Sequence, residues 1–213
     1  MPTVTKLAPD PRQPGYRVVE VDRGRFASLP SEALEALPIP LKPGVELPPP
    51  VLERLQDLAD VEAACRAGLR ALATRGRARR DLRRRLIQKQ HPPQAVDEAL
   101  ARLDAQGLLD DRRFAVAYAA RHAARGRGPA RLIADLLGQG VDRAVADTAV
   151  GEALADEGID PERALRAVAT RRASQLSALA PAVRKRRLLA YLARRGYGGA
   201  EVREVVDEVC GVS

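Results

Sequence analysis

The feature that most constrains this chain is a pattern of apolar residues that recurs three times at intervals of about fifty residues. Leu82 and Leu86 share one face of a predicted helix, and Val96, Leu100 and Leu103 share one face of the next. Shifted by fifty and then by fifty-six residues, the same positions hold Leu132, Leu136, Ala146, Val150 and Ala153, and then Leu188, Leu192, Val202, Val206 and Val209. The spacing predicts a mainly α fold, a tandem array of helix-turn-helix-like repeats that bury apolar surface partly on their neighbours.

The helical region is predicted to start at Val51 or Val61. Each repeat is predicted to contain three helices, the first covering roughly residues 61–73, 112–124 and 161–174. Asp111 and Asp160 directly precede two of these helices and are predicted N-caps, because a carboxylate accepts hydrogen bonds from the free N–H groups of a helix start. Pro129 and Pro181 are predicted first residues of second helices, a position that requires no N–H donor.

The N-terminal part of the chain has a different character. Residues 3–7, 16–21 and 25–29 are strand-like and predict a small β-meander. Residues 38–50 contain six prolines in thirteen positions, a density that excludes helix and predicts an extended connector. The expected division is therefore a β-rich segment (1–37), a connector (38–50) and three repeats (51–110, 111–159 and 160–213).

Composition limits the cellular setting and the kind of core. Aromatic residues make up only 3% of the chain, so Leu, Val and Ala must form the core. Cys65 and Cys210 lie far apart without neighbouring ligands and are interpreted as small buried hydrophobes. No apolar run approaches the ~20 residues of a membrane span, and no signal peptide is evident. We expect a cytoplasmic protein that does not contact membranes.

The net charge of +8 makes an anionic partner plausible, and it is distributed unevenly. Residues 1–60 carry −2, residues 61–110 carry +5, residues 111–159 are neutral and residues 160–213 carry +5. Arginine outnumbers lysine by 32 to 4, so the codon usage of a GC-rich genome is an alternative origin of the excess. The placement of the arginines must decide between the two.

The second helices of the outer repeats are the most basic elements. With Leu82 and Leu86 turned inward, the neighbouring arginines face outward, and two pairs of them repel at i, i+4 spacing, which an anion-binding surface would explain. A basic loop precedes the second helix of the middle repeat, at a helix N-terminus where anions can bind. The predicted anion-binding residues are Arg77, Arg79, Arg80, Arg83, Arg84, Arg125, Arg127, Arg131, Arg184, Lys185, Arg186, Arg187, Arg194 and Arg195.

The residue types needed for catalysis do not come together in any known motif. His91 and His122, the only histidines, lack metal-ligand spacing to another donor. No phosphate-binding Gly-Lys-Ser/Thr motif and no Gly-x-Ser-x-Gly nucleophile setting occur. We expect a binding protein that is not an enzyme, with no catalytic residues, no metal and no cofactor.

A family resemblance rests on the middle of the chain. The sequence Gly-Leu-Leu-Asp-Asp-Arg-Arg-Phe-Ala at residues 107–115, Tyr118, Arg121 and the Gly-Arg-Gly-Pro loop at residues 126–129 occur in one order and spacing. Over about residues 51–210 the chain resembles the bacterial RecX family. Phe114 and Tyr118, one helical turn apart, are interpreted as core residues in this signature.

The resemblance implies a fold and a function. RecX proteins are arrays of three-helix repeats that bind the filament of RecA on DNA and inhibit the ATPase, strand-exchange and co-protease activities of RecA, in recombination, DNA repair and the SOS response. The resemblance implies that the partners are the RecA filament and single- and double-stranded DNA, and that the basic residues above contact filament or DNA. We also expect a monomer, although the sequence leaves the oligomeric state open.

Two alternatives remain at the level of sequence. Three-helix units with tight turns resemble helix-turn-helix modules, so the chain could bind DNA without RecA. Against this, the last helix of each unit carries outward acidic residues that would face phosphates unfavourably, namely Asp97, Glu98, Asp142, Asp147, Glu201, Glu204 and Asp207. The other alternative is an interaction scaffold whose basic faces bind acidic proteins.

Overall fold

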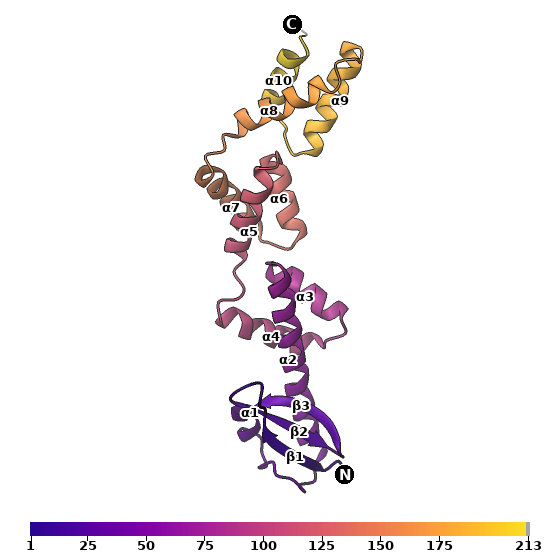
Figure 1. Cartoon of the computed structure of the whole chain (residues 1–213), viewed down its shortest axis with the longest axis vertical. Helices are drawn as coiled ribbons and strands as arrows, with labels where there is room; N and C mark the ends of the chain where they lie inside the picture. Colours follow the sequence, from indigo (N-terminus) through magenta and orange to yellow (C-terminus); the bar gives the residue numbers. More distant parts are fainter. Residues whose placement is uncertain (212–213) are drawn as a thin grey trace. The chain divides into compact units, whose positions relative to one another are not determined.

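Helices dominate the computed structural model, which describes residues 1–211, except for the side chain of Arg25 (Figure 1). Ten helices and one three-stranded sheet occur in this part of the chain. They form two compact units. The first unit comprises residues 1–76 and 82–109, and the second comprises residues 77–81 and the chain from residue 110 onward.

The first unit begins with an antiparallel sheet in the order β1-β2-β3. Strands β1 (Val4–Pro9), β2 (Tyr16–Val21) and β3 (Gly24–Pro30) pair as consecutive neighbours, so the predicted meander is confirmed. Asp22 and Arg23 form the two-residue turn between β2 and β3, both with positive φ, as the tight hairpins of twisted sheets require.

The proline-rich segment packs onto this sheet. After the short helix α1 (Ser31–Glu35), Leu37, Leu41 and Leu47 are buried in the same apolar core as the strands. The backbone N–H of Val4 donates to the carbonyl of Val45 at 2.9 Å, and Gly44 donates back to Val4 at 2.8 Å. The extended conformation follows from the prolines, and the buried leucines fix the segment in place.

Helix α2 (Pro49–Thr74) begins inside the proline-rich run. The prediction that residues 38–50 exclude helix is wrong for the last two of them. Of the two predicted starts of the helical region, Val51 is close to the observed start and Val61 is too late. Pro49 and Pro50 occupy the first turn, where a backbone N–H has no partner within the helix and its absence costs nothing.

Helix α2 serves two cores of the first unit. Its N-terminal half contributes Val51, Leu55 and Leu58 to the core of the sheet. Its C-terminal half contributes Ala64 and Ala67 to the core with α3 (Arg79–Gln88) and α4 (Pro93–Ala105). The sheet and the first three-helix repeat are therefore continuous through one helix.

A polar cluster lies on α2 between these two cores. Glu62 is buried and accepts a hydrogen bond from Arg102 Nη1 at 2.9 Å, and Arg102 Nη2 donates to Glu98 Oε1 at 2.6 Å. Burial raises the pKa of the Tyr16 hydroxyl, and its hydrogen bond with Glu62 raises the pKa further. The cluster links β2, α2 and α4 through one buried carboxylate.

The second unit contains two three-helix repeats (Figure 1). Each of them has its own core. Leu132 and Leu136 are fully buried in one core, and Leu188 and Leu192 are fully buried in the other. The predicted class, a mainly α array of three-helix repeats, is confirmed, while the finer five-part division remains a prediction. The helices are α5 (Asp111–Ala123), α6 (Pro129–Gly138), α7 (Arg143–Asp156), α8 (Pro161–Ser174), α9 (Pro181–Arg194) and α10 (Ala200–Cys210).

The helix starts follow the predicted chemistry with one correction. The cap of α8 is Asp160, which accepts from the N–H of Glu162 at 2.9 Å, and Pro129 and Pro181 open α6 and α9 as predicted. The cap of α5 is Asp110, which accepts from Arg113 N at 2.8 Å, whereas Asp111 lies in the first turn and accepts from Arg79 N at 2.7 Å. Because Asp110 and Asp111 are adjacent, the sequence alone did not distinguish the cap from the first-turn residue.

The second and third repeats meet at a joint of close backbone contacts, formed by Gly128, Arg131, Arg195 and Gly196. The N–H of Gly128 donates to the carbonyl of Arg195 at 2.7 Å. Gly196 has a φ of +84°, and a Cβ atom added there would lie 2.2 Å from the backbone nitrogen of Arg131. Only glycine fits this joint without a shift of backbone.

Candidate functional site

All the arginines at the start of α3 were predicted to face outward, but only some of them are exposed. Arg80 and Arg84 are exposed, whereas Arg79 and Arg83 are half-buried. The guanidinium of Arg83 donates to both oxygens of Asp97 on α4, at 2.6 and 2.9 Å. Arg79 and Arg84 also have interaction partners of their own. The positive charge of this helix is therefore partly neutralised within the protein.

Arg77 is not exposed, so it is removed from the predicted anion-binding set. Its side chain is buried and its Nη1 donates to Oδ2 of the buried Asp81 at 2.9 Å. The neighbouring Ala78 is fully buried in the core of the second repeat, which draws this segment inward. The sequence shows an arginine in a basic run and gives no sign of this burial.

The basic loop of the second repeat is also internally paired. Arg127 and Arg131 both form ion pairs with Asp135, the latter with an Nε–Oδ1 distance of 2.9 Å. The hydroxyl of Tyr118 donates to Asp135 at 3.2 Å and accepts from Arg127 at 2.9 Å. Burial raises the pKa of Tyr118, and Asp135 raises it further. Phe114 and Tyr118 pack against the core, in agreement with their interpretation as core residues.

His122 lies one turn after Tyr118, with 4.3 Å between the ring centroids. Burial lowers the pKa of His122 below its ordinary value of 6.5, and the positive charges of Arg127 and Arg125 lower it further, against an opposing effect of Asp135. Because the folded protein favours the neutral ring, the unfolded chain binds more protons at acid pH. The contribution of His122 to stability is therefore fully present above pH 6.5 and is lost as the pH falls through its lower folded-state pKa.

We expect His122→Gln to remove this part of the pH dependence. Urea titrations between about pH 7 and about pH 5 should show a smaller loss of unfolding free energy for the variant than for the unchanged protein. His91→Gln is the matched control, because His91 lies in the turn before α4. Equal pH dependence in His122→Gln and the unchanged protein would show that His122 is not the titrating group.

Helix α9 presents the largest exposed set of predicted residues. Arg184 donates to the carbonyl of Cys210, and Lys185 pairs with Asp207 on α10, so both are occupied within the repeat. Within residues 1–211, the side chains of Arg186, Arg187 and Arg194 form no hydrogen bond or ion pair, and all three are exposed. We call these three residues the α9 surface.

Arg125 and Arg195 are seventy residues apart and lie together in the structure. Arg195 Nη1 donates to the carbonyl oxygens of Arg125 and Gly126, at 3.1 Å each. Both residues line a pocket of about 580 Å³ between the second and third repeats. Arg171 and Arg172 of α8 line the same pocket and were not predicted, although their adjacency at the end of a predicted helix was an available signal.

The two remaining features of the described residues concern clusters of metal ligands and helices that could span a membrane. No group of three or more His, Cys, Asp or Glu side chains in residues 1–211 has an arrangement that could hold a metal ion. None of the helices in this part of the chain is both long and apolar enough to span a bilayer.

Comparisons with known proteins agree on one family. Models of the first, second and third three-helix domains of RecX match residues 64–103, 110–150 and 160–206, respectively. The regulatory protein RecX of Halorhodospira halophila is 38% identical over 144 residues, which cover 67% of this chain and 85% of that protein. Regulatory protein RecX of Mycobacterium ulcerans is 36% identical over 165 residues, covering 76% and 91%.

Solved structures support the same fold. A crystal structure of a regulatory protein RecX superposes with a TM-score of 0.72 at 17% identity and covers 98% of both chains. The crystal structure of RecX from Lactobacillus salivarius gives a TM-score of 0.56 at 18% identity, covering 72% of this chain and 98% of the other. With the three matched domains and the extended sequence identity, the chain belongs to the RecX family.

Proposed function

We propose that this protein regulates RecA by binding the RecA filament on DNA, and that it lowers the ATPase, strand-exchange and co-protease activities of the filament. The relatives that match most of its length are named regulatory proteins, which supports a regulatory role. It acts by binding, as a cytoplasmic monomer without a cofactor, and it contacts single- or double-stranded DNA as well as RecA.

The observation that carries this proposal is the α9 surface. Several arginines in residues 1–211 are paired to carboxylates, as Arg83 is to Asp97 and Arg166 is to Glu208. Arg186, Arg187 and Arg194 have no such partner in residues 1–211 and extend into solvent from one helix. Guanidinium groups in this state bind phosphate oxygens or carboxylates of a partner with two parallel hydrogen bonds.

A helix-turn-helix mode without RecA is less consistent with the charges. In that mode the last helix of a unit enters the major groove and faces phosphates. In this protein the last helices carry exposed carboxylates, including Glu98, Asp147 and Glu204. Asp97 and Asp207 of these helices neutralise cations of the second helices, which gives them a role in stabilising the repeat.

The direct test is the ATPase rate of RecA on single-stranded DNA with this protein added well below RecA stoichiometry. We expect the rate to fall, because one bound regulator affects several protomers of a filament through contacts that add by multivalency. A rate that stays unchanged up to stoichiometric amounts of the protein would overturn the proposed function.

Reversing the charge of the α9 surface should weaken inhibition strongly. For Arg186→Glu, Arg187→Glu and Arg194→Glu combined, we expect half-inhibition of RecA to require at least about tenfold more protein, since several phosphate or carboxylate contacts are lost. The matched control is Arg12→Glu, Arg23→Glu and Arg54→Glu, three exposed arginines of the first unit with the same total change of charge. Equal inhibition by both triple variants would show that net charge, and not this surface, is what matters.

A further inference from the structure

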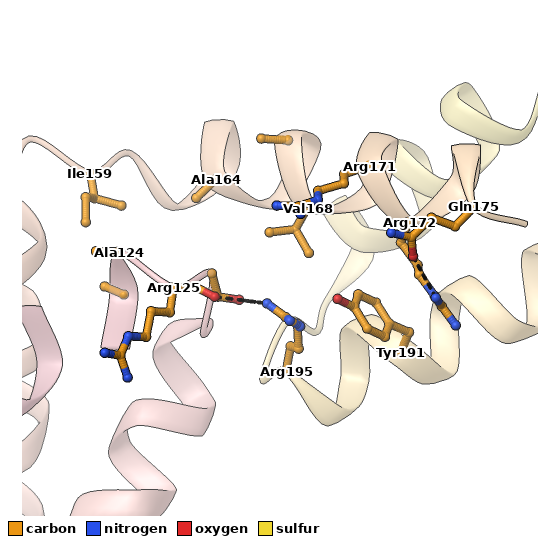
Figure 2. A pocket seen from close by; sticks show the side chains of 13 residues that line it. Ala124, Arg125, Ile159, Ala164, Val168, Arg171, Arg172, Gln175, Tyr191 and Arg195 are labelled. Carbon is orange, nitrogen blue, oxygen red and sulfur yellow. Dashed lines mark hydrogen bonds between the residues drawn. The ribbon is translucent and has the colours of Figure 1, made fainter. Parts of the chain in front are cut away.

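The pocket between the second and third repeats has an unusual lining. Its walls come from the end of α5 and the following loop, from α8 and from α9, as Figure 2 shows. One part of the wall is apolar and is formed by Ala164, Ala167 and Val168 of α8 together with Ala124 and Ile159. The rest is cationic, and no acidic residue lines the pocket.

The four arginines of this lining lack carboxylate partners. Arg195 donates to backbone carbonyls, and Arg172 donates to the neutral amide of Gln175 at 2.7 Å. The side chains of Arg125 and Arg171 are exposed and form no hydrogen bond or ion pair with residues 1–211. Several other arginines of the unit pair with acids, as Arg112 does with Glu152 and Arg143 does with Asp147. The pocket thus concentrates uncompensated positive charge.

The positions of two of these arginines are fixed by Tyr191. The guanidinium carbon of Arg172 lies 5.0 Å from the centre of the Tyr191 ring, and that of Arg195 lies 4.9 Å from it. In Figure 2 the ring lies between the two side chains. Cation–π contacts hold the guanidinium groups in place but do not cancel their charge. The Nε of Arg172 is buried and has no partner, so a donor at the pocket remains unsatisfied.

This combination indicates the chemistry of a ligand. Uncompensated guanidinium groups favour phosphate oxygens, and the apolar part of the wall favours an uncharged planar or carbon-rich group attached to the phosphate. A volume of about 580 Å³ is in the range of small-molecule sites and far too small to admit a duplex. A nucleotide meets both requirements, and in a single strand its phosphate and base can rotate into a recess.

We propose that the pocket lined by Arg125, Arg171, Arg172 and Arg195 binds one nucleotide of single-stranded DNA, with the phosphate on the guanidinium groups and the sugar or base against the α8 wall. The site deepens the proposed function, because it would let the protein hold the strand on which RecA assembles. It can be tested on bare DNA, however, so its success or failure does not depend on any effect on RecA.

The test is the binding of a fluorescently labelled oligothymidylate to the full chain, measured by anisotropy over a range of salt concentrations. For Arg125→Glu with Arg171→Glu we expect about tenfold weaker binding. The slope of log affinity against log salt should become shallower by about 1.4, since each contact with a single-strand phosphate contributes about 0.7. The control Arg163→Glu with Arg203→Glu changes the net charge equally at exposed positions outside the pocket. Circular dichroism checks that both variants are folded.

A second pair of variants tests entry into the pocket without a change of charge. Ala167→Leu narrows the pocket at an exposed position of α8 and should weaken oligothymidylate binding several-fold. Ala182→Leu, an exposed position of α9 outside the pocket, should leave binding unchanged. If the arginine pair matters but Ala167→Leu binds like the unchanged protein, DNA passes over the surface and the pocket assignment is wrong.

Competitors distinguish the possible sources of the phosphate and the other class of partner. Thymidine monophosphate should displace the oligonucleotide only at much higher concentration, because it lacks the contacts of the neighbouring nucleotides. If it competes as well as the oligonucleotide does, the pocket takes a free nucleotide and the strand assignment is overturned. Stronger displacement by an oligoglutamate than by unlabelled oligothymidylate would assign the pocket to an acidic peptide instead.

Discussion

The substitution Gly196→Ala is expected to lower the free energy of unfolding by at least about 2 kcal/mol, because it combines left-handed backbone strain with overpacking. Gly196 has a φ of +84°, and the new Cβ would lie 2.2 Å from Arg131 N and 2.3 Å from Arg131 Cβ. Both repeats present backbone at this contact, so relief requires the third repeat to move away from the second. The hydrogen bond from Gly128 N to the Arg195 carbonyl would be lost in that movement.

Substitutions at two other glycines of the same unit, measured by urea titration, separate the cost of backbone strain from the cost of overpacking. Gly158→Ala introduces backbone strain alone, since φ is +60° and no atom lies within 4 Å of the new Cβ. Gly151→Ala lies within α7 in open space and should stabilise the helix slightly, by up to about 1 kcal/mol. If Gly196→Ala costs no more than Gly158→Ala, the joint between the repeats is looser than its backbone contacts indicate.

A comparably large loss is expected for Asp81→Ala, at about 3–5 kcal/mol, since the buried Arg77 guanidinium would lose its carboxylate. The pair is enclosed, with 7% of the Arg77 side chain and 10% of the Asp81 side chain exposed. Urea titration gives the size of the effect.

The double variant Arg77→Met with Asp81→Leu serves as the control. It removes both charges together and should recover most of the lost stability, because apolar side chains can replace a buried ion pair at little cost. If the double variant is as unstable as Asp81→Ala, helix-capping or other contacts of Asp81 matter more than its pairing with Arg77. The same variant should bind DNA normally, since Arg77 is not at the surface.

Features with a local cause were predictable from the sequence. Leu132 and Leu136, like their counterparts in the other repeats, are four residues apart and lie on one face of a helix. This spacing identified the three-helix units, because a helix that packs on a core needs apolar residues along one face. The cap at Asp160 was predictable because its partner, the backbone N–H of Glu162, is only two residues away in sequence. The start of α2 was not, because prolines at a first helical turn and prolines in an extended segment look alike in sequence.

The binding surface was harder to predict because neutralisation of charge is a tertiary effect. Arg83 meets Asp97 across fourteen residues, and Lys185 meets Asp207 on another helix, so the sequence showed cations without their partners. The pocket was not predictable from the sequence either, because it brings together cations that are distant along the chain. Arg125 and Arg195 come from different repeats. Arg171 was not predicted, because its place in the pocket depends on residues from other elements, including Tyr191 of α9.

Helix α2 is long enough to extend beyond the first repeat, and the β-meander covers the apolar residues of this extension. A terminal repeat lacks a neighbour on one side, and its apolar residues need some other cover. Val51, Leu55 and Leu58 would be such residues on α2, and the three strands with their proline-rich extension bury them. The sheet thus acts as an N-terminal cap of the first repeat, built on the same helix.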